Sequence, residues 1–349
     1  MKLVTFEVEG PLGRCRRLGA LLRETEAGGI VDLTAAFARH LRDETDEPTP
    51  CELAALRAPP DMIGWLRAGH EGRKAAEQAL AYVRAHPGAL GLDGERLLWE
   101  RKDVRLLAPL PRPGAFRDCS IYAQHMTRAQ RPNETKPREL GKSPDWYKAP
   151  PYYKGSTTSI AGPEDPVPFP YYTEFLDLEI ELGIILGKEG SNLTVAEAEA
   201  CIAGYTILID SSARDGNARE PFGPNKRKDF HTALGPWLVT KDEIDPEQLP
   251  CKVEVDGELW FEGNTSALHS FSPAQLVAYI SDNETVYPGD LIGTGTIGFG
   301  CSMDIHKWPQ IGQTATFTMQ GLGAMSLKVV KGPHIVSHVA GMKGYLAPP

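Results

Sequence analysis

The sequence predicts an α+β protein that is mostly β, with a small N-terminal domain over residues 1–108 and a larger β-rich domain over 115–349. From residue 174 onwards, short strands alternate with turn residues, and neither a βαβ rhythm nor an internal repeat is evident. Three prolines in APLPRPG (108–114) are typical of a junction between domains. With 349 residues, of which 41% are hydrophobic, the chain can bury a large core.

The N-terminal part mixes strands and helices. Its first residues, MKLVTFEVEG, alternate like a strand and lack the apolar core of a signal peptide. Residues 32–42 and 71–86 have helical patterns, the first with Asp32 and Thr34 as candidate caps and the second ending at Pro87. We expect an α+β domain without a cluster of catalytic residues.

Composition narrows the class of partner. The formal charge of −9 argues against binding to nucleic acid, and no run of about 18 apolar residues predicts a membrane span. The six cysteines form no CxxC pair, which is typical of reduced cytoplasmic thiols. We therefore expect a soluble, cytoplasmic protein.

Two kinds of segment interrupt the strands of the second half. Residues 131–170 are rich in proline, lysine and tyrosine and predict a structureless lid, substrate loop or linker. Residues 194–203 and 272–281 are predicted as short helices, because Thr194 and Ser272 begin capping boxes.

The stretch LDLEIELGIIL (176–186) alternates aliphatic and acidic residues. This pattern predicts a half-buried strand whose acidic face, with Asp177, Glu179 and Glu181, is solvated. Like charges roughly 6.5–7 Å apart on one face favour a bound cation. Because the next apolar strand ends in Asp210, the carboxylates together suit Mg²⁺, Mn²⁺ or Ca²⁺ rather than zinc. Asp177 is expected to be solvated or to support the ligands.

A second candidate cluster is FRDCSIYAQHM (116–126). On a helix, Asp118 and His125 would share one face about 10 Å apart, so that Asp118 could reach the metal and His125 a substrate. The alternative is a capping aspartate and a surface histidine. Similarly, KRK at 226–228 reads as a solvated turn and His231 as structural.

The glycine-rich stretch 289–305 contains G-x-G-x-x-G, but no helix follows it, which excludes a dinucleotide-binding fingerprint. We instead expect a loop that exposes its backbone to a ligand, with Thr294 and Thr296 as hydrogen-bond donors.

Taken in order, these motifs resemble the fumarylacetoacetate hydrolase superfamily over residues 115–330. Some members of that superfamily carry a small SH3-like barrel, which the resemblance makes the alternative for the N-terminal domain. The matching stretches are FRD followed by His125, LDLEIELGIILG (176–187), IDSSARD (209–215), KDFHTALGPW (228–237) and GDLIGTGTIGFG (289–300) followed by MDI. The resemblance implies that four carboxylates hold a divalent cation: Asp118, Glu179, Glu181 and Asp210.

The resemblance also implies roles for other residues. His125 falls on the catalytic base and Asp304 on the residue that orients it, although the family has a glutamate there, so we expect a loose or water-mediated contact. Lys228 and Arg214 fall on positions that stabilise negative charge. The expected substrate contacts are Asn217, Thr296 and, from the 131–170 loop, Tyr153.

The implied reaction is metal-dependent hydrolysis of a C–C bond in a 1,3-dicarbonyl acid such as an acylpyruvate, by a homodimer using Mg²⁺, Mn²⁺ or Ca²⁺. A lyase of the same superfamily (a decarboxylase, dehydratase or isomerase) would share the metal site without an activated water, and a non-catalytic metal-binding module is the third possibility.

Overall fold

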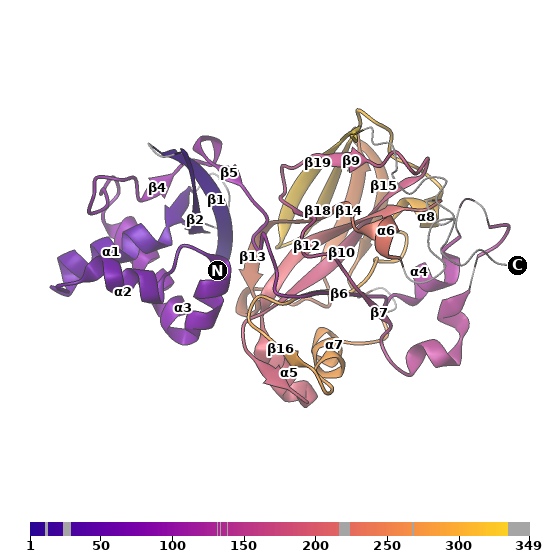
Figure 1. Ribbon diagram of the computed structural model, residues 1–349, viewed down its shortest axis with the longest axis horizontal. Helices are drawn as coiled ribbons and strands as arrows, with labels where there is room; N and C mark the ends of the chain where they lie inside the picture. Colours follow the sequence, from indigo (N-terminus) through magenta and orange to yellow (C-terminus); the bar gives the residue numbers. More distant parts are fainter. Residues whose placement is uncertain are drawn as a thin grey trace, which may run out of the picture.

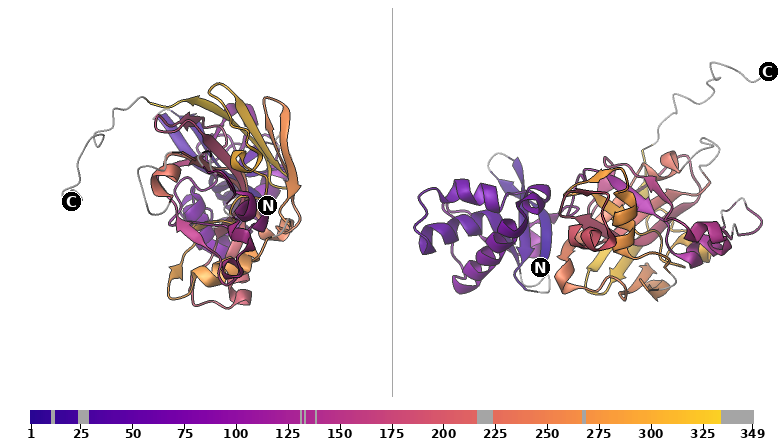
Figure 2. Two further views of the ribbon diagram at one scale, coloured as in Figure 1. Left: turned by 90° about the vertical axis from the view of Figure 1, so that its right-hand side faces the viewer. Right: turned by 90° about the horizontal axis from the view of Figure 1, so that it is seen from below.

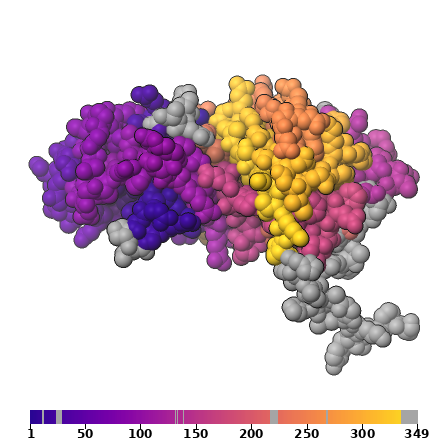
Figure 3. All heavy atoms as spheres, turned by 90° about the horizontal axis from the view of Figure 1, so that it is seen from above, coloured from indigo at the N-terminus to yellow at the C-terminus, as the bar shows by residue number. Residues whose placement is uncertain are grey.

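The computed structural model describes residues 1–10, 13–23, 29–130, 132, 134–137, 139–215, 224–266 and 269–333. Two large sheets dominate the part that it describes, in agreement with the predicted mostly β class, and an N-terminal lobe with three helices lies at one end (Figures 1 and 2). Figure 3 shows this lobe in indigo and purple beside the larger body formed by the rest of the chain.

The larger sheet has twelve strands, in the order β4-β3-β2-β1-β13-β12-β10-β17-β6-β7, with β5 paired to β1 and β8 to β13. Its strands are β1 (Lys2–Gly10), β2 (Gly13–Leu21), β3 (Ile30–Asp32), β4 (Leu98–Trp99), β5 (Arg105–Leu106), β6 (Phe116–Cys119), β7 (Tyr152–Lys154), β8 (Ile160–Ala161), β10 (Leu176–Leu186), β12 (Ile202–Ala213), β13 (Thr232–Thr240) and β17 (Leu291–Gly293).

The second sheet has five strands in the order β15-β14-β18-β19-β9, and β11 and β16 form a separate pair. These strands are β9 (Val167–Phe169), β11 (Gly190–Ser191), β14 (Pro250–Val255), β15 (Glu258–Asn264), β16 (Thr285–Val286), β18 (Thr314–Met319) and β19 (Gly323–Lys331). The helices are α1 (Leu33–Glu44), α2 (Pro50–Arg57), α3 (Met62–Ala85), α4 (Ala123–Arg128), α5 (Val195–Cys201), α6 (Asn225–Lys228), α7 (Pro273–Ile280) and α8 (Ser302–Ile305).

The N-terminal lobe is α+β, the first of the two expected alternatives. The side chain of Asp32 caps α1 by accepting from the Ala35 amide, and α3 is kinked at Gly69, which has a positive φ of 55°. Strand β1 pairs with β13 through Lys2↔Val239 and Leu3↔Leu238, so the sheet continues from this lobe into the second half of the chain. The division into 1–108 and 115–349 therefore stays a prediction.

Strand β10 is buried along its whole length, so the predicted solvated face is wrong. Its even-numbered residues, such as Ile180 and Leu182, belong to a core shared with the five-stranded sheet. On the opposite face, Ile185 belongs to the core of the N-terminal helices. Alternation marks the two faces of a strand, but the tertiary structure decides whether water reaches the polar one.

The 131–170 segment is not structureless where it is described. It contains two short 3-10 helices, Leu140–Lys142 and Pro144–Tyr147, and the strands β7, β8 and β9, which pair with β6, β13 and β19. Proline and polar residues obscured these strands because each has only two or three residues. Tyr153 lies on β7 opposite Asp118 and is thereby held beside that residue.

The capping boxes of α5 and α7 are confirmed: Thr194 and Glu197 bond reciprocally, as do Ser272 and Gln275. Among the described residues, no helix has the length and apolar character needed to cross a membrane.

Candidate active site

Four neighbouring strands bring the predicted metal ligands together. In the antiparallel pair of β10 and β12, Glu179 lies directly opposite Asp210, so both carboxylates project from the same face. On the other side of β10, Gly183 pairs with Gly293 of β17, which in turn pairs with Asp118 of β6. The register therefore gathers residues separated by more than ninety positions in the chain onto one patch of sheet.

Three of these carboxylates form one cluster. Oxygen atoms of Asp118, Glu181 and Asp210 lie within 4.8 Å of one another, and all three residues are buried. A side chain at Gly293 would collide with Asp118 Oδ1 and crowd Glu181, so glycine there leaves room for the carboxylates to converge. Asp118 Oδ1 and Asp210 Oδ1 are buried without a hydrogen-bond partner in the described structure.

The electrostatics of this cluster favour the binding of a cation. Burial, and after it the charge of Asp210, raises the pKa of Asp118 well above its usual range. Burial and the charge of Asp118 do the same to the pKa of Glu181, and burial raises the pKa of Asp210. A divalent cation with oxygen ligands fits this site, because it would both use the two orphaned oxygens and offset the repulsion.

Glu179, beside the cluster, is already compensated. Its carboxylate accepts hydrogen bonds from Ser212 (2.9 Å) and Thr296 (2.6 Å) and forms ion pairs with Arg214 and Lys228. Burial favours the neutral acid, but Arg214 and Lys228 outweigh it and hold the pKa of Glu179 well below its usual range. Lys228 also pairs with Asp210 and thus bridges Glu179 to the cluster.

His125 and Asp304 form a direct pair. The imidazole Nδ1 lies 3.1 Å from each carboxylate oxygen of Asp304, so the expected loose contact is replaced by a close one, despite the shorter side chain. Asp304 also accepts from the Phe299 amide at 3.0 Å, which fixes its orientation. Although burial lowers the pKa of His125, Asp304 outweighs this effect and raises it, which makes the imidazole a stronger base.

The helix expected to carry both Asp118 and His125 is wrong. Asp118 belongs to strand β6, whereas His125 lies on the separate helix α4. The spacing of seven residues reflects a strand, a short loop and one helical turn, which a helical wheel cannot represent. Lys228 ends the short helix α6 and is mostly buried, so the solvated turn predicted for 226–228 is wrong at this residue.

Asp177 is completely buried rather than solvated. It accepts from Arg214 Nε at 2.7 Å and from the backbone amides of Ser302 and Met303 at 2.6 and 3.2 Å. Asp177 therefore joins the guanidinium of Arg214 to the first turn of α8, which carries Asp304. It supports the predicted site from behind.

A pocket of about 200 Å³ opens onto these groups. Its lining includes one wall with most of the predicted site residues, among them Tyr153 and Thr296, and a less polar wall with Met126, Ala129, Leu140 and Met303. Tyr153 donates to Asp210 Oδ2 at 2.9 Å. Asn217, the remaining predicted substrate contact, lies outside the described residues.

Sequence reasoning missed several residues of this site. Ser212 hydrogen-bonds Glu179, Cys119 lines the pocket, and Cys301 lies 3.7 Å from His125 Nδ1. Ser212 could have been found, because it follows Asp210 by two positions and so shares its face of β12. No local pattern marks the two cysteines.

Sequence comparison places the chain in a family. The model of the fumarylacetoacetate (FAA) hydrolase C-terminal domain matches residues 116–330, which include all the site residues above. The chain therefore belongs to the fumarylacetoacetate hydrolase family. A protein from Burkholderia ambifaria strain MC40-6, whose name gives only a provisional assignment as a hydrolase, is 34% identical over 255 residues, or 71% of this chain and 83% of its own length.

Solved structures share the fold across most of the chain. The fumarylacetoacetate hydrolase of Exiguobacterium antarcticum has a TM-score of 0.66 at 25% identity and covers 95% of this chain and 99% of its own. The maleylpyruvate hydrolase of Sphingobium sp. SYK-6, solved with Mn²⁺ and pyruvate, has a TM-score of 0.65 at 23% identity and covers 95% and 100%. A 2-hydroxyhepta-2,4-diene-1,7-dioate isomerase from Mycobacterium marinum has a TM-score of 0.61 at 24% identity and covers 95% and 98%. The same fold thus serves a hydrolase and an isomerase.

Proposed function

We propose that this protein is a divalent-metal-dependent hydrolase that cleaves a C–C bond in a 1,3-dicarbonyl acid of the acylpyruvate type. The observation that carries the proposal is the close His125–Asp304 pair, whose imidazole lines the same pocket as Asp118 and Glu181 of the buried carboxylate cluster. A base beside a cation site is what water-dependent cleavage of such a substrate requires.

The proposed metal ligands are Asp118, Glu179, Glu181 and Asp210, with the first, third and fourth converging most closely. When bound, a cation there would polarise the dicarbonyl and stabilise the enolate that leaves. Oxygen ligands suit Mg²⁺, Mn²⁺ and Ca²⁺. The Mn²⁺ and pyruvate held by the Sphingobium hydrolase support Mn²⁺ and a 2-oxo acid as the first probes to try.

His125 acts as the general base in this proposal. Asp304 accepts a hydrogen bond from Nδ1–H, so the proton of the neutral imidazole stays on Nδ1 and Nε2 has a free lone pair. Nε2 takes a proton from water, and the water oxygen bonds to the distal carbonyl carbon. The bond from that carbon to the neighbouring CH₂ then breaks, and its electron pair remains with the 2-oxo acid fragment as an enolate. The proton held on His125 Nε2 passes to the CH₂ carbon, which gives the products, a carboxylic acid and a 2-oxo acid, and restores the base.

Lys228 and Arg214 stabilise the negative charge that develops during these steps. Lys228 has three N–H donors and uses two on Glu179 and Asp210, so one remains for a substrate oxygen. Arg214 is held against Glu179 by Asp177, and both cations line the pocket. Because their carboxylate partners fix them in place, little reorganisation accompanies the reaction.

The test is a screen of acylpyruvates and 3-oxo acids with Mg²⁺ or Mn²⁺, with EDTA as the control, followed by the His125→Gln variant on the best substrate. We expect EDTA to abolish turnover and His125→Gln to lower kcat by roughly 10³-fold, while Mn²⁺ binding measured by calorimetry persists. Near-normal turnover by the variant would show that His125 is not the base.

If the protein is instead a lyase of the same superfamily, water does not become part of a released carboxylic acid. In ¹⁸O-labelled water, hydrolysis places one solvent oxygen in the released carboxylic acid, whereas isomerisation or decarboxylation places none there. Tight Mn²⁺ binding without turnover of any tested substrate would instead favour a non-catalytic metal-binding module. The expected homodimer is tested separately by sedimentation.

A further inference from the structure

Cys301 lies beside the pair that the proposed mechanism uses as its base. Its Sγ is 3.7 Å from His125 Nδ1, and that nitrogen is 3.1 Å from each oxygen of Asp304. Ligand atoms from all three buried residues lie within 4.8 Å of one another. The residues combine a thiol, an imidazole and a carboxylate, whereas the cluster of Asp118, Glu181 and Asp210 offers oxygen alone.

These separations match the edges of a zinc tetrahedron. Bonds of about 2.0 Å to nitrogen or oxygen and 2.3 Å to sulfur, meeting at a tetrahedral angle, set ligand atoms roughly 3.3 Å (N to O) and 3.6 Å (N to S) apart. The distances of 3.1 and 3.7 Å therefore need shifts of only a few tenths of an ångström. We propose that His125, Cys301 and Asp304 form a second metal site that takes Zn²⁺ or a similar thiophilic cation.

The surroundings supply what such a site needs. Asp177 and Glu179 also have oxygen atoms within 4.8 Å of the Cys301 thiol and of each other, so they form a second group of potential ligands. Three carboxylates therefore lie near this thiol, against the single guanidinium of Arg214, and the local charge favours a cation. His125 Nε2 lies 3.7 Å from Glu179, so the ring nitrogen not bound to zinc faces a carboxylate, as metal-bound histidines commonly do.

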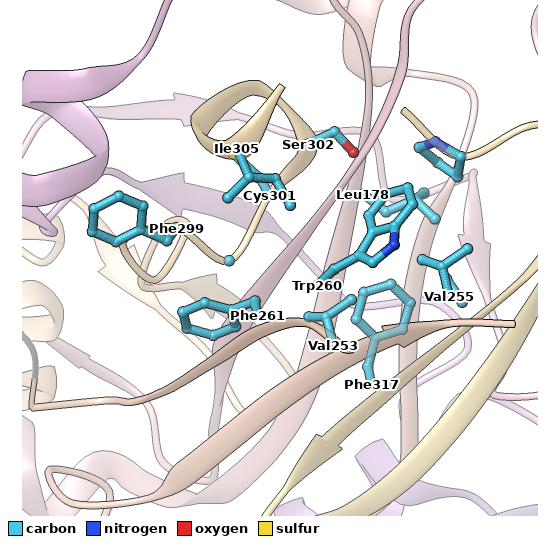
Figure 4. Close-up of a pocket in the computed structure, with 13 residues that line it drawn as sticks. Leu178, Val253, Val255, Trp260, Phe261, Phe299, Cys301, Ser302, Ile305 and Phe317 are labelled. Atoms are coloured by element: carbon cyan, nitrogen blue, oxygen red, sulfur yellow. The ribbon is translucent and has the colours of Figure 1, made fainter. Parts of the chain in front are cut away.

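The thiol is also shielded on one side and reachable on the other. Figure 4 shows Cys301 with Ser302 and Ile305 at the edge of an apolar pocket that Trp260, Phe261 and Val253 help to line. An apolar surround excludes water and strengthens coordination. On the other side, His125 lines the 200 Å³ pocket, which gives a cation its entry path.

Zinc at this site would inhibit the enzyme, a consequence that rests on the proposed function. Coordination releases the thiol proton and uses the Nδ1 lone pair of His125, so the remaining ring proton must sit on Nε2. The imidazole then has no lone pair with which to accept a proton from water. Mg²⁺ prefers the oxygen cluster and zinc the sulfur-containing site, so the two cations act at different places.

Cobalt tests the binding directly, because Co²⁺ substitutes for zinc and gives a thiolate charge-transfer band in the near ultraviolet. The metal-free chain is titrated with Co²⁺ in the presence of excess Mg²⁺, which occupies the oxygen cluster. We expect one cobalt–thiolate band per chain in the wild type and none in Cys301→Ser. The matched control is Cys119→Ser, another buried cysteine that lines the pocket, and it should retain the band.

Absence of the band in the wild type, its persistence in Cys301→Ser, or its loss in Cys119→Ser would overturn the proposal. Circular dichroism and Mn²⁺ binding establish that Cys301→Ser is folded. If it is not, His125→Gln provides the second test, since loss of the nitrogen ligand should weaken Co²⁺ binding by at least roughly tenfold. Unchanged affinity in that variant would exclude the three-residue site.

Activity separates this inference from the proposed function. With millimolar Mg²⁺ and a working substrate, the Zn²⁺ concentration for half-inhibition should rise at least roughly tenfold in Cys301→Ser, each variant being compared with its own zinc-free rate. If the cobalt–thiolate band appears but zinc does not inhibit, the metal site is supported and the role of His125 as the base is contradicted.

Discussion

Two sets of carboxylates face one pocket in opposite electrostatic states. Glu179 is surrounded by Arg214, Lys228 and two hydroxyl donors, and its pKa is lowered. Glu181, two residues along the same strand face, packs against Asp118, and its pKa is raised. Since both are buried glutamates on β10, burial does not distinguish them. The difference lies in what the neighbouring strands contribute: cations beside Glu179, and further carboxylates beside Glu181.

Buried carboxylates on one strand face can therefore be compensated in two different ways. Glu179 has its counter-charges built into the chain, whereas Asp118 and Glu181 leave that role to a cation. Perturbing the first set should therefore harm the fold, whereas perturbing the second should harm metal binding.

The largest expected effect is on the compensated side. Lys228→Met removes a cation that pairs with both Glu179 and Asp210, and breaking a buried ion pair in this way costs about 3–5 kcal/mol. Urea denaturation in EDTA should show that loss in the free energy of unfolding. The control is Lys226→Met, an exposed lysine in the same short helix, expected to change stability by less than about 0.5 kcal/mol. Equal effects of the two substitutions would contradict the distinction.

On the opposite face of β12, a buried histidine has no ion-pair partner among the described residues and can be compared with these carboxylates. Ser211, next to Asp210, bonds His231 Nδ1 at 2.8 Å, and burial lowers the pKa of His231 to about 4, with only Asp165 acting against it. The unfolded chain has the ordinary pKa of 6.5 and binds the proton more readily. This contribution to stability is therefore complete above pH 6.5 and is lost as the pH falls towards 4, by roughly 3 kcal/mol in total.

His231→Gln should remove this part of the acid sensitivity. Urea denaturation between pH 7 and pH 4 would show a shallower decline of stability for the variant than for the wild type. His70→Gln, at an exposed site, should leave the decline unchanged. Parallel curves for wild type and His231→Gln would mean that the imidazole is protonated without cost.

On the uncompensated side, Asp118→Asn should weaken Mn²⁺ binding by about 100-fold, or roughly 2.8 kcal/mol. The same substitution removes a repelled charge, so the metal-free protein should be no less stable than the wild type. Calorimetry measures the first effect and urea denaturation in EDTA the second. Asp145→Asn, at an exposed position, should change neither. A large loss of stability without metal would show that the charge of Asp118, like that of Glu179, is compensated by the chain itself.

The smallest effect is expected at Tyr153. Tyr153→Phe removes one hydrogen bond to Asp210, which should weaken Mn²⁺ binding by about 1 kcal/mol. This corresponds to a change in affinity of less than roughly tenfold. Its neighbour Tyr152 is more exposed and lies on the other face of β7, so Tyr152→Phe should bind Mn²⁺ like the wild type. Indistinguishable affinities for the two variants would show that Tyr153 does not support the site.

Much of the architecture could be read from the chain. The mostly β class, the capping boxes at Thr194 and Ser272 and the acidic face of 176–186 all depend on local spacing, which backbone geometry converts directly into structure. The three strands β7, β8 and β9 could not be read in the same way, because two- and three-residue strands form only where a partner strand is already in place.

The sequence by itself determined which residue types could meet: carboxylates at fixed intervals in 176–186 and 202–213, a histidine after FRD, and Lys228 just before β13. Only the tertiary structure decided how those charges are shared, because pairing between β6, β17, β10 and β12 joins residues that are distant along the chain. It buried Asp177 behind Arg214 and placed Cys301 against His125. Spacing sets the face on which a side chain lies, whereas its charge state and partners depend on what packs against that face.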